Sequence, residues 1–336
     1  MIKIDKFNFL DLHKKYHFED NDSNGIFTLW HYTSVDGFMG IIRDKPNEHK
    51  KLHFWFTRSD CLNDTSEGNH VLSMFQASCK EMLAQDKINK TFYDCIINSE
   101  ISAHQFVHFP ITPKDDCVSN SIMDCVPCDA YICSFSLKED SLDMWRYYSK
   151  NNGGYGLKFL YNIFDGQKRY SYSDFNQNAK FCCIHSYRVI YDDAEKKEIL
   201  ENIILDTYMA YINSKDDDEK RVDNSQKFIN YALKSFQFKF KHECYKSEQE
   251  YRFVLFQPYN KPKDLENELY EVRFRSQNGI VVPYIDVTVE SQYASLCEVL
   301  ISPYIKNESS LATTSDYTSK CGFNCIVKKS LLPARE

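Results

Sequence analysis

The sequence predicts an α+β fold. Short runs rich in aromatic and β-branched residues alternate irregularly with segments whose apolar residues recur at helical spacing. The regular strand–helix alternation of a parallel α/β protein is missing. With 336 residues and only 10 Gly and 9 Pro, the chain favours a large core without long flexible linkers. We expect a lead-in segment over 1–26 and a single catalytic-type domain over 27–336, with helical insertions at about 67–108 and 193–241.

The individual elements follow from these two patterns in chain order. Strands are expected over residues 27–32, 52–57, 131–136, 155–159, 186–191, 251–256, 269–274, 279–284 and 298–302. Helices are expected over residues 35–43, 67–88, 91–107, 140–150, 193–213, 219–241 and 308–320. An acidic turn, Lys215–Asp218, separates the two longest helices and is typical of solvated surface.

The composition limits the class of protein. Hydrophobic residues make up 43% and charged residues 26% of the chain, as in ordinary globular proteins. A net charge of −7 gives no global basic footprint for nucleic acid. The N-terminus lacks the pattern of a signal peptide, and no apolar run approaches the roughly 18 residues of a membrane span. We therefore expect a cytoplasmic protein without membrane contact.

Cysteine usage is high but does not predict a disulfide framework. The 13 cysteines are an odd number in a chain too long to be a disulfide-stapled miniprotein. Cys125 and Cys128 have the spacing of a zinc knuckle or a redox pair, but no second pair lies nearby in the sequence. Buried free thiols are the default interpretation, and metal binding by this pair stays open.

The stretch from Tyr245 to Phe256 is the most informative. Its second half is apolar and aromatic and predicts a buried strand, and Glu248 and Glu250 lie at the entrance to that strand. If the strand has begun there, both carboxylates and Arg252 point to the same face, because side chains alternate. Two acids on one face raise each other's pKa unless a cation intervenes. A structural ion-pair network and a catalytic site are both consistent with this pattern.

Other candidates each have a structural alternative. His31 in a strand is a ligand-binding candidate or a core histidine with a satisfied hydrogen bond. Asn63, Asp64 and Glu67 are candidates for binding a metal or ligand, but a helix cap explains them equally well.

Arg58, Trp145 and Tyr148 are the remaining candidates of this kind. Arg58 is suited to hold a diphosphate through a bidentate contact, or to form a surface ion pair. Trp145 and Tyr148 lie three residues apart on a predicted helix, where core packing is the commoner explanation.

An ordered set of sequence blocks resembles a bacterial family catalogued as domain of unknown function 2971 (DUF2971). The blocks are Leu29–Ser34, Leu62–Asp64 with Glu67, Cys133–Ser136, Met144–Trp145, Tyr148, Gly154–Phe159, Lys246, Glu248–Arg252 and Ser330–Pro333. The resemblance extends over roughly residues 27–335. The family name implies no activity, so a function has to be argued from the site.

A second resemblance is to ADP-ribosyltransferases. The strand His31-Tyr32-Thr33 with the helix after it resembles their opening motif, in which the histidine binds the nicotinamide ribose of NAD. Glu248-Gln249-Glu250 resembles the Glu-x-Glu of their arginine-directed members. This implies a mixed, mostly antiparallel sheet core, with Glu250 as the main catalytic carboxylate and Glu248 as a general base.

The same resemblance implies a ligand and a setting. NAD would be bound as substrate, without a metal, by Tyr32 and Thr33 of the opening strand. Trp55, Trp145, Tyr148 or Tyr155 would provide aromatic walls for the nicotinamide ring, and Arg252 would fix the carboxylate. A bacterial defence or toxin role would fit such chemistry. A protein, a nucleic acid or water would accept the ADP-ribose, and the oligomeric state stays open.

Two other classes of function compete with this hypothesis. A metal-dependent nuclease or phosphodiesterase would gather Mg²⁺ with Asp64, Glu67, Glu248 and Glu250. A non-catalytic sensor would bind a nucleotide in an aromatic pocket without turnover. Sensitivity to a chelator distinguishes the first alternative, and saturable binding without turnover distinguishes the second.

Overall fold

A computed structural model describes residues 27–62, 67–98, 128–149, 153–164, 183–258, 270–277, 279–290 and 296–333. The predictions for the lead-in segment 1–26, for Asn63 and Asp64, and for Cys125 lie outside these residues. Glu67 and Cys128 each begin an element, but their side chains lie outside the description as well.

The described strands form one sheet of ten strands. They are β1 (Thr28–Ser34), β2 (Lys51–Arg58), β3 (Cys128–Ser136), β4 (Gly154–Leu160), β5 (Cys183–Arg188), β6 (Glu250–Pro258), β7 (Val272–Gln277), β8 (Ile280–Glu290), β9 (Leu296–Ile301) and β10 (Ile326–Lys329). The order is β10-β9-β4-β1-β3-β2-β8-β7, and β6 pairs with both β3 and β5. Only β9 and β10 pair in parallel among these strands. The predicted α+β class with a mixed, mostly antiparallel sheet is confirmed.

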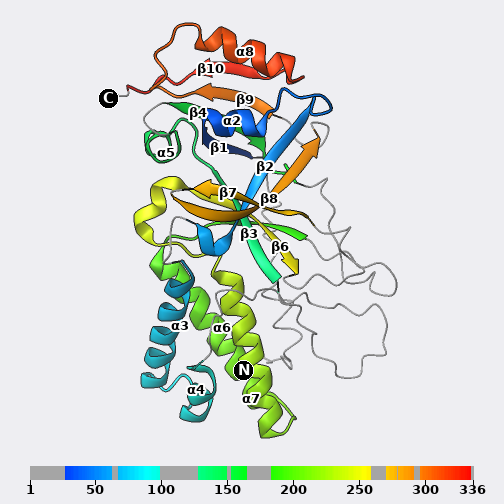
Figure 1. The fold of residues 1–336 in the computed structure, drawn as a ribbon. Helices are drawn as coiled ribbons and strands as arrows, with labels where there is room; N and C mark the ends of the chain where they lie inside the picture. The colour runs from blue at the N-terminus through cyan, green and yellow to red at the C-terminus, as the bar shows by residue number, and fades with distance from the viewer. Residues whose placement is uncertain are drawn as a thin grey trace.

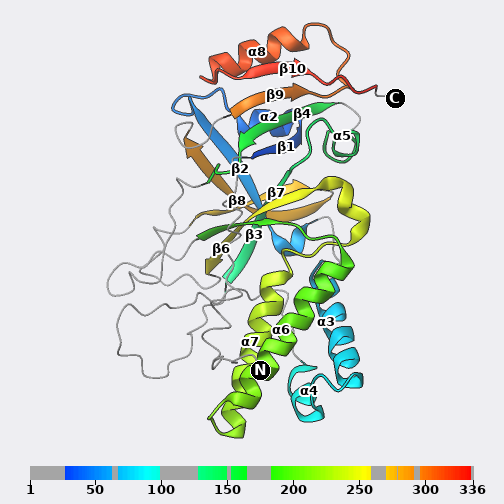
Figure 2. The same ribbon diagram turned by 180° about the vertical axis from the view of Figure 1, so that it is seen from behind.

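The helices gather at the two ends of the molecule. They are α2 (Val35–Ile41), α3 (Glu67–Ala84), α4 (Lys90–Ile96), α5 (Leu142–Tyr148), α6 (Asp193–Asn213), α7 (Asp218–Phe236) and α8 (Ser310–Lys320). Figures 1 and 2 show α3, α4, α6 and α7 packed together at one end, below the strands. The helices α2, α5 and α8 lie at the other end, beside β1, β4, β9 and β10. No helix among the described residues is long and apolar enough to cross a membrane.

Alternation along β6 separates two hydrophobic cores. Val254 and Phe256 pack into the core formed with the helices α3, α4, α6 and α7. Tyr251, Phe253 and Leu255 point to the opposite face and join an aromatic core under β1, β2 and β4. Because side chains alternate along a strand, Glu250 and Arg252 share the face of Val254 and Phe256. They therefore lie at the end of β6 where the helical core stops.

Local sequence sets where several helices begin. The side chain of Ser34 accepts a hydrogen bond from the backbone N–H of Gly37, which caps α2. Asp192 caps α6 in the same way, and Asp217 of the acidic turn caps α7. The acidic turn between the long helices is thus also a helix start, where carboxylates are favoured by the dipole.

Strand β3 is the point where the sheet divides. On one side it pairs with β6 along its whole length. On the other side it meets β1 only at the pair Trp30–Ser136 and β2 only at Thr57–Ile132 and Arg58–Tyr131. Between these pairs β1 and β2 diverge, and no described strand pairs with this edge of β3. The backbone groups of β3 need other partners there.

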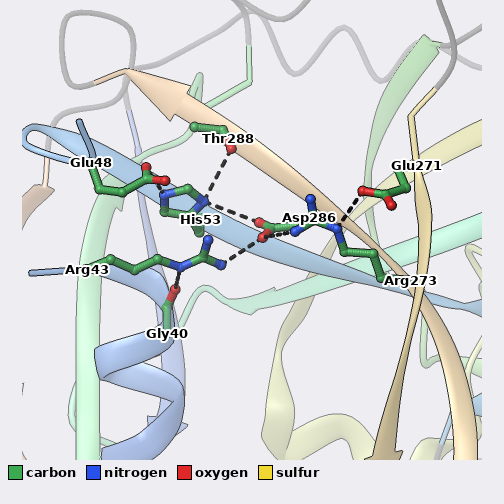
Figure 3. A network of polar contacts seen from close by, with 8 residues as sticks. All are labelled: Gly40, Arg43, Glu48, His53, Glu271, Arg273, Asp286 and Thr288. Carbon is green, nitrogen blue, oxygen red and sulfur yellow. Dashed lines mark hydrogen bonds and ion pairs between the residues drawn. The ribbon is translucent and has the colours of Figure 1, made fainter. Parts of the chain in front are cut away.

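A polar cluster fixes β2 against β8 next to this gap (Figure 3). His53 lies between two carboxylates, with Nε2 2.8 Å from Glu48 Oε2 and Nδ1 3.3 Å from Asp286 Oδ1. Arg43, just after α2, donates to Asp286 Oδ2 at 2.7 Å, and Arg273 of β7 lies 3.3 Å from the same oxygen. The cluster joins α2, β2, β7 and β8 into one wall.

The stretch before β6 differs from the prediction. Glu243–Glu248 form a 3-10 helix, η3, and Gln249 adopts a left-handed conformation with φ of 42°. The strand therefore begins at Glu250, so strand alternation does not place Glu248. Helix α7 ends at Phe236 rather than at 241, which leaves Lys241 in the loop between α7 and η3.

Candidate functional site

The diverging strands β1 and β2 open a cavity of about 770 Å³. Its floor is the exposed edge of β3, from Ile132 to Phe135, and its walls come from β1, α2, β2, α5, η3, β6 and β7. The volume is in the range of small-molecule and cofactor sites. The predicted site residues that line it are His31, Tyr32, Thr33, Trp55, Tyr148, Glu248, Glu250 and Arg252. Residues that are far apart in the sequence, from Trp30 to Gln277, thus meet in one cavity.

The two predicted carboxylates converge on one ammonium group. Lys241 Nζ donates to Glu248 Oε2 at 2.8 Å and to Glu250 Oε2 at 2.9 Å. All three side chains are at least nine-tenths buried. Burial opposes the charged form of Lys241, but the charges of Glu250 and Glu248 outweigh it and raise the lysine pKa. The lysine is therefore a permanent cation between two acids.

Glu250 is held by hydrogen bonds on both oxygens. Arg252 donates from Nε to Oε1 at 2.7 Å and from Nη2 to Oε2 at 2.9 Å. Ser134 Oγ donates to Oε1 at 2.5 Å, and Lys241 completes the set. Burial favours the neutral acid, but the Arg252 and Lys241 charges and these hydrogen bonds prevail and lower the pKa of Glu250 to about 2. Glu250 is a fixed anion.

Glu248 differs from Glu250 in its freedom to exchange a proton. Burial raises the pKa of Glu248, and the opposing Lys241 charge does not cancel the shift. Within the described part of the chain, Lys241 is its hydrogen-bond partner and its other oxygen has none. A carboxyl group with a raised pKa and an available oxygen in a cavity is suited to proton transfer.

His31 presents a neutral nitrogen to the cavity. Its Nδ1 lies 3.0 Å from the carbonyl oxygen of Ser134, on the edge of β3 that faces no other described strand. A carbonyl only accepts, so Nδ1 carries the proton and Nε2 carries the lone pair. Burial lowers the pKa of His31 to about 4, although the Ser134 hydrogen bond opposes the shift. Near pH 7 the ring is therefore an uncharged hydrogen-bond acceptor.

Two aromatic residues give the cavity its apolar walls. Tyr148, at the end of α5, is half-buried, and burial together with the nearby Glu248 and Glu250 raises its pKa, so the phenol stays protonated. Trp55 of β2 is 37% exposed, and its ring centroid lies 5.0 Å from that of Tyr284. A planar ligand ring has aromatic surfaces available at both places.

Tyr32 lines the cavity, and Trp145 packs against Tyr32 without lining it. The Tyr32 hydroxyl donates to the Lys138 carbonyl oxygen and accepts from the Ser141 N–H, so its polar group is occupied. Trp145 is fully buried, packs edge-on against Tyr32 and donates its indole N–H to Asp140. Trp145 does not line the cavity.

Arg58 is also absent from the cavity lining. Its guanidinium forms a bidentate pair with Asp60 on the surface, through contacts of 2.7 and 3.0 Å. The sequence allowed Arg58 either a diphosphate contact or a surface ion pair, and the structure shows the surface ion pair.

Three residues that line the cavity are not predicted as site residues from the sequence: Ser134, Lys241 and Arg275. The predicted helix 219–241 includes Lys241, and Ser134 is one of several serines in the predicted strands. Arg275 followed an expected strand that ends at residue 274. The sequence does contain a pattern that could have identified Arg275. In Val272-Arg273-Phe274-Arg275 apolar and basic residues alternate, which places both arginines on one face of a strand. No local signal identified Lys241.

The donor set does not favour a divalent cation between the carboxylates. The ammonium of Lys241 already lies between Glu248 and Glu250, where a bridging metal would have to bind. Among the residues that the structure describes, no group of three or more histidine, cysteine or acidic side chains is placed to hold a metal ion.

Comparison with known proteins gives one match. The profile of a family described as "Protein of unknown function (DUF2971)" matches residues 144–253. This range holds Tyr148, Lys241, Glu248, Glu250 and Arg252, so the match includes the carboxylate end of the cavity. The predicted resemblance to this family is confirmed over that range. No curated protein and no solved structure matches the chain.

Proposed function

We propose that the protein is an enzyme that binds NAD in this cavity and cleaves its nicotinamide–ribose bond, transferring ADP-ribose to an acceptor or to water. One observation carries the proposal: a buried carboxylate pair and a neutral histidine face the same cavity of about 770 Å³. The resemblance of the His31 and Glu248–Glu250 segments to ADP-ribosyltransferases supplies the reaction class.

The chemistry requires stabilisation of a positive charge. When the bond between C1′ of the ribose and nicotinamide breaks, its electron pair stays on the nicotinamide nitrogen and positive charge develops on the sugar. Anionic groups aimed at this position lower the barrier most when they are already oriented. Glu250 meets this condition, because Arg252, Ser134 and Lys241 fix both of its oxygens.

The two glutamates have different roles in this proposal. Glu250 is the fixed anion that holds Arg252 and Lys241 in place and contributes negative potential. Glu248 has the raised pKa and the available oxygen, so it takes the proton of the attacking hydroxyl, amine or water as the new bond to C1′ forms. His31 Nε2 accepts a hydrogen bond from a ribose hydroxyl and orients the sugar.

The nicotinamide ring needs a planar slot near the carboxylates. Tyr148 lines the cavity, and Glu248 and Glu250 lie near enough to it to affect its pKa. Its ring therefore offers the leaving group an aromatic wall near the carboxylates. Trp55 lies on β2, on a different wall, and suits the other end of the ligand.

Nicotinamide release from NAD tests this function. Purified protein is incubated with NAD and EDTA, and nicotinamide is measured by chromatography for the wild type, Glu248→Gln and Glu250→Gln. Glu243→Gln is the matched control, because Glu243 is an exposed residue of η3. We expect release by the wild type and control, and a loss of about 100-fold or more in Glu248→Gln.

Other outcomes would favour a competing function. If Glu248→Gln and Glu250→Gln fold and still release nicotinamide at the wild-type rate, the proposed site is wrong. If the folded wild type binds ADP-ribose but releases no nicotinamide with arginine-rich protein, nucleic acid or water as acceptor, a nucleotide-sensing module replaces the enzyme. If phosphodiester cleavage appears and EDTA abolishes it, the metal-dependent alternative is favoured.

A further inference from the structure

Arg275 of β7 contributes a positive charge to the cavity. It is half-buried and lines the cavity together with its neighbours Ser276 and Gln277. Its guanidinium carbon lies 5.0 Å from the ring centroid of Trp55 and 5.4 Å from that of Tyr284. The two rings support the planar group by cation–π contact. The guanidinium is therefore held in one orientation.

Most of the hydrogen-bonding capacity of Arg275 is unused. Nη2 donates to Thr57 Oγ1 at 2.9 Å and to Gln277 Oε1 at 2.8 Å. Both acceptors are neutral. Arginine has five N–H donors, and within the described residues Nε and Nη1 of Arg275 have no acceptor. A guanidinium binds two oxygens of a phosphate or carboxylate through Nη1 and Nη2, and such an anion can replace one of the two neutral acceptors of Nη2.

The other cations at the cavity are balanced by carboxylates. Lys241 and Arg252 pair with Glu248 and Glu250. Arg275 forms no ion pair among the described residues, and burial lowers its pKa, because the smaller opposing effects of Tyr284 and Cys133 do not cancel the cost of burying the charge.

The lining contains one more acid, Asp36, and strand β7 has a second arginine, Arg273, outside the lining. Asp36, in the first turn of α2, is exposed and makes no ion pair with Arg275 within the described residues. Arg273, two residues before Arg275 on the same strand, pairs with Glu271 and Asp286 and does not line the cavity (Figure 3).

We propose that Arg275, supported by Trp55 and Tyr284, is an anion subsite that binds a phosphate group of a nucleotide whose reacting end lies at Glu248 and Glu250. The identity of that nucleotide as NAD rests on the proposed function, but the subsite does not. The subsite divides the cavity into a carboxylate end for a sugar and a guanidinium end for phosphate. Arg275 thereby takes the diphosphate role that the sequence suggested for Arg58.

Equilibrium binding without turnover tests the subsite. Dissociation constants of ADP, ADP-ribose and adenosine are measured by calorimetry for the wild type, Arg275→Gln, Arg275→Lys and Arg273→Gln. The last variant removes the same charge from the same strand outside the cavity. Thermal unfolding of each variant shows that it is folded, and Arg275→Lys keeps the charge but removes the planar fork.

The expected pattern depends on phosphate. Arg275→Gln should raise the dissociation constants of ADP and ADP-ribose by about tenfold or more, because a charge-assisted bidentate contact with phosphate is lost. Adenosine binding should change less than twofold, and Arg273→Gln should resemble the wild type. Arg275→Lys should fall between Arg275→Gln and the wild type, since a point charge replaces the fork.

Two results would overturn the subsite. One is equal affinity of ADP for the wild type and Arg275→Gln, and the other is absence of ADP and ADP-ribose binding to the folded wild type. Either result is separable from failure of the proposed function, which nicotinamide release and Glu248→Gln decide. Phosphate-dependent binding lost in Arg275→Gln, in a protein that never cleaves NAD, would support the subsite and refute the enzyme.

Discussion

Lys241 Nζ lies 2.9 Å from Oε2 of Glu250, and this contact joins the helical part of the molecule to the sheet. Lys241 follows α7 in the chain, whereas Glu250 begins the central strand β6. The backbone carbonyl of Lys241 in turn accepts a hydrogen bond of 2.7 Å from Lys196, a fully buried residue of α6. The position of the lysine thus depends on both halves of the fold.

Removal of the Glu250 charge should destabilise the protein. Glu250→Gln leaves Lys241 and Arg252 buried with only Glu248 to balance them, which typically costs about 3 kcal/mol or more of unfolding free energy. Urea unfolding followed by circular dichroism measures the change. Glu243→Gln, on the exposed side of η3, should change it by less than about 0.5 kcal/mol. A loss below about 1 kcal/mol in Glu250→Gln would contradict the assigned anchoring role.

Loss of Lys241 should destabilise the protein more at high pH than at low pH. The Lys241 charge opposes the burial that raises the pKa of Glu248, so Lys241→Met should raise that pKa further. An acid whose pKa is raised by folding loses stability as pH rises from its unfolded value through its folded value. Thermal unfolding at pH 5 and pH 8 should show the larger deficit at pH 8. The exposed Lys246→Met is the control, and an equal deficit at both pH values would argue against the coupling.

His31 should make the protein sensitive to mild acid. Its pKa falls from 6.5 in the unfolded chain to about 4 in the fold. Between these values the unfolded chain binds a proton that the folded protein does not, so stability falls as pH decreases from about 6.5 toward 4. At about 1.4 kcal/mol per pKa unit, the contribution is on the order of 3 kcal/mol. His31→Asn retains an N–H donor for the Ser134 carbonyl and should flatten this part of the stability curve, whereas His49→Asn, at an exposed position, should leave it unchanged.

Activity, if it depends on Glu248, should have an acid limb. The carboxylate form of Glu248 accepts the proton of the nucleophile. Because burial raises the pKa of Glu248, the rate should decrease as the pH is lowered, beginning at a pH above the ordinary titration range of glutamate. Glu248→Gln should lower kcat by about 100-fold or more and remove this limb. Initial rates of nicotinamide release from pH 4 to pH 9 measure both effects. An unchanged acid limb in the variant would assign proton transfer to another group.

Gly154 should tolerate no side chain. A Cβ atom there would lie 2.2 Å from the backbone oxygen of Thr33 and 2.7 Å from Cβ of Ser149, and a backbone atom cannot move aside cheaply. Gly154→Ala should therefore cost about 2 kcal/mol of unfolding free energy by overpacking. Gly40→Ala places its Cβ at an ordinary 3.6 Å from Trp55 and is the matched control. Equal melting temperatures of the two variants would contradict this packing.

Local pattern in the sequence was enough to locate the regular elements. The aromatic runs around Trp30 and Phe54 have the period of strands, and the structure has β1 and β2 there. The long periodic segments that begin at 193 and 219 are α6 and α7, with starts within one residue of the prediction. Period and capping depend on residues close in sequence, so they can be inferred without the fold.

The candidate carboxylates were also found from sequence, but for a partly wrong geometric reason. Glu250 and Arg252 do share a strand face, as alternation predicts. Glu248 reaches the same cluster from a 3-10 turn, after the left-handed residue Gln249. Strand alternation does not extend beyond Gln249, and Glu248 and Glu250 come together only through their shared contact with Lys241.

Tertiary structure decided the rest of the site. The sequence offers both Trp55 and Trp145 as candidates for a ligand wall, but Trp55 is partly exposed in the cavity and Trp145 is fully buried. The cavity itself exists because β1 and β2 each pair with β3 over only one or two residues and then diverge. The sequence by itself determined which segments are strands and helices and which residues carry charge. Which charges meet depends on contacts between segments far apart in the chain, and local period and propensity contain no information on those contacts.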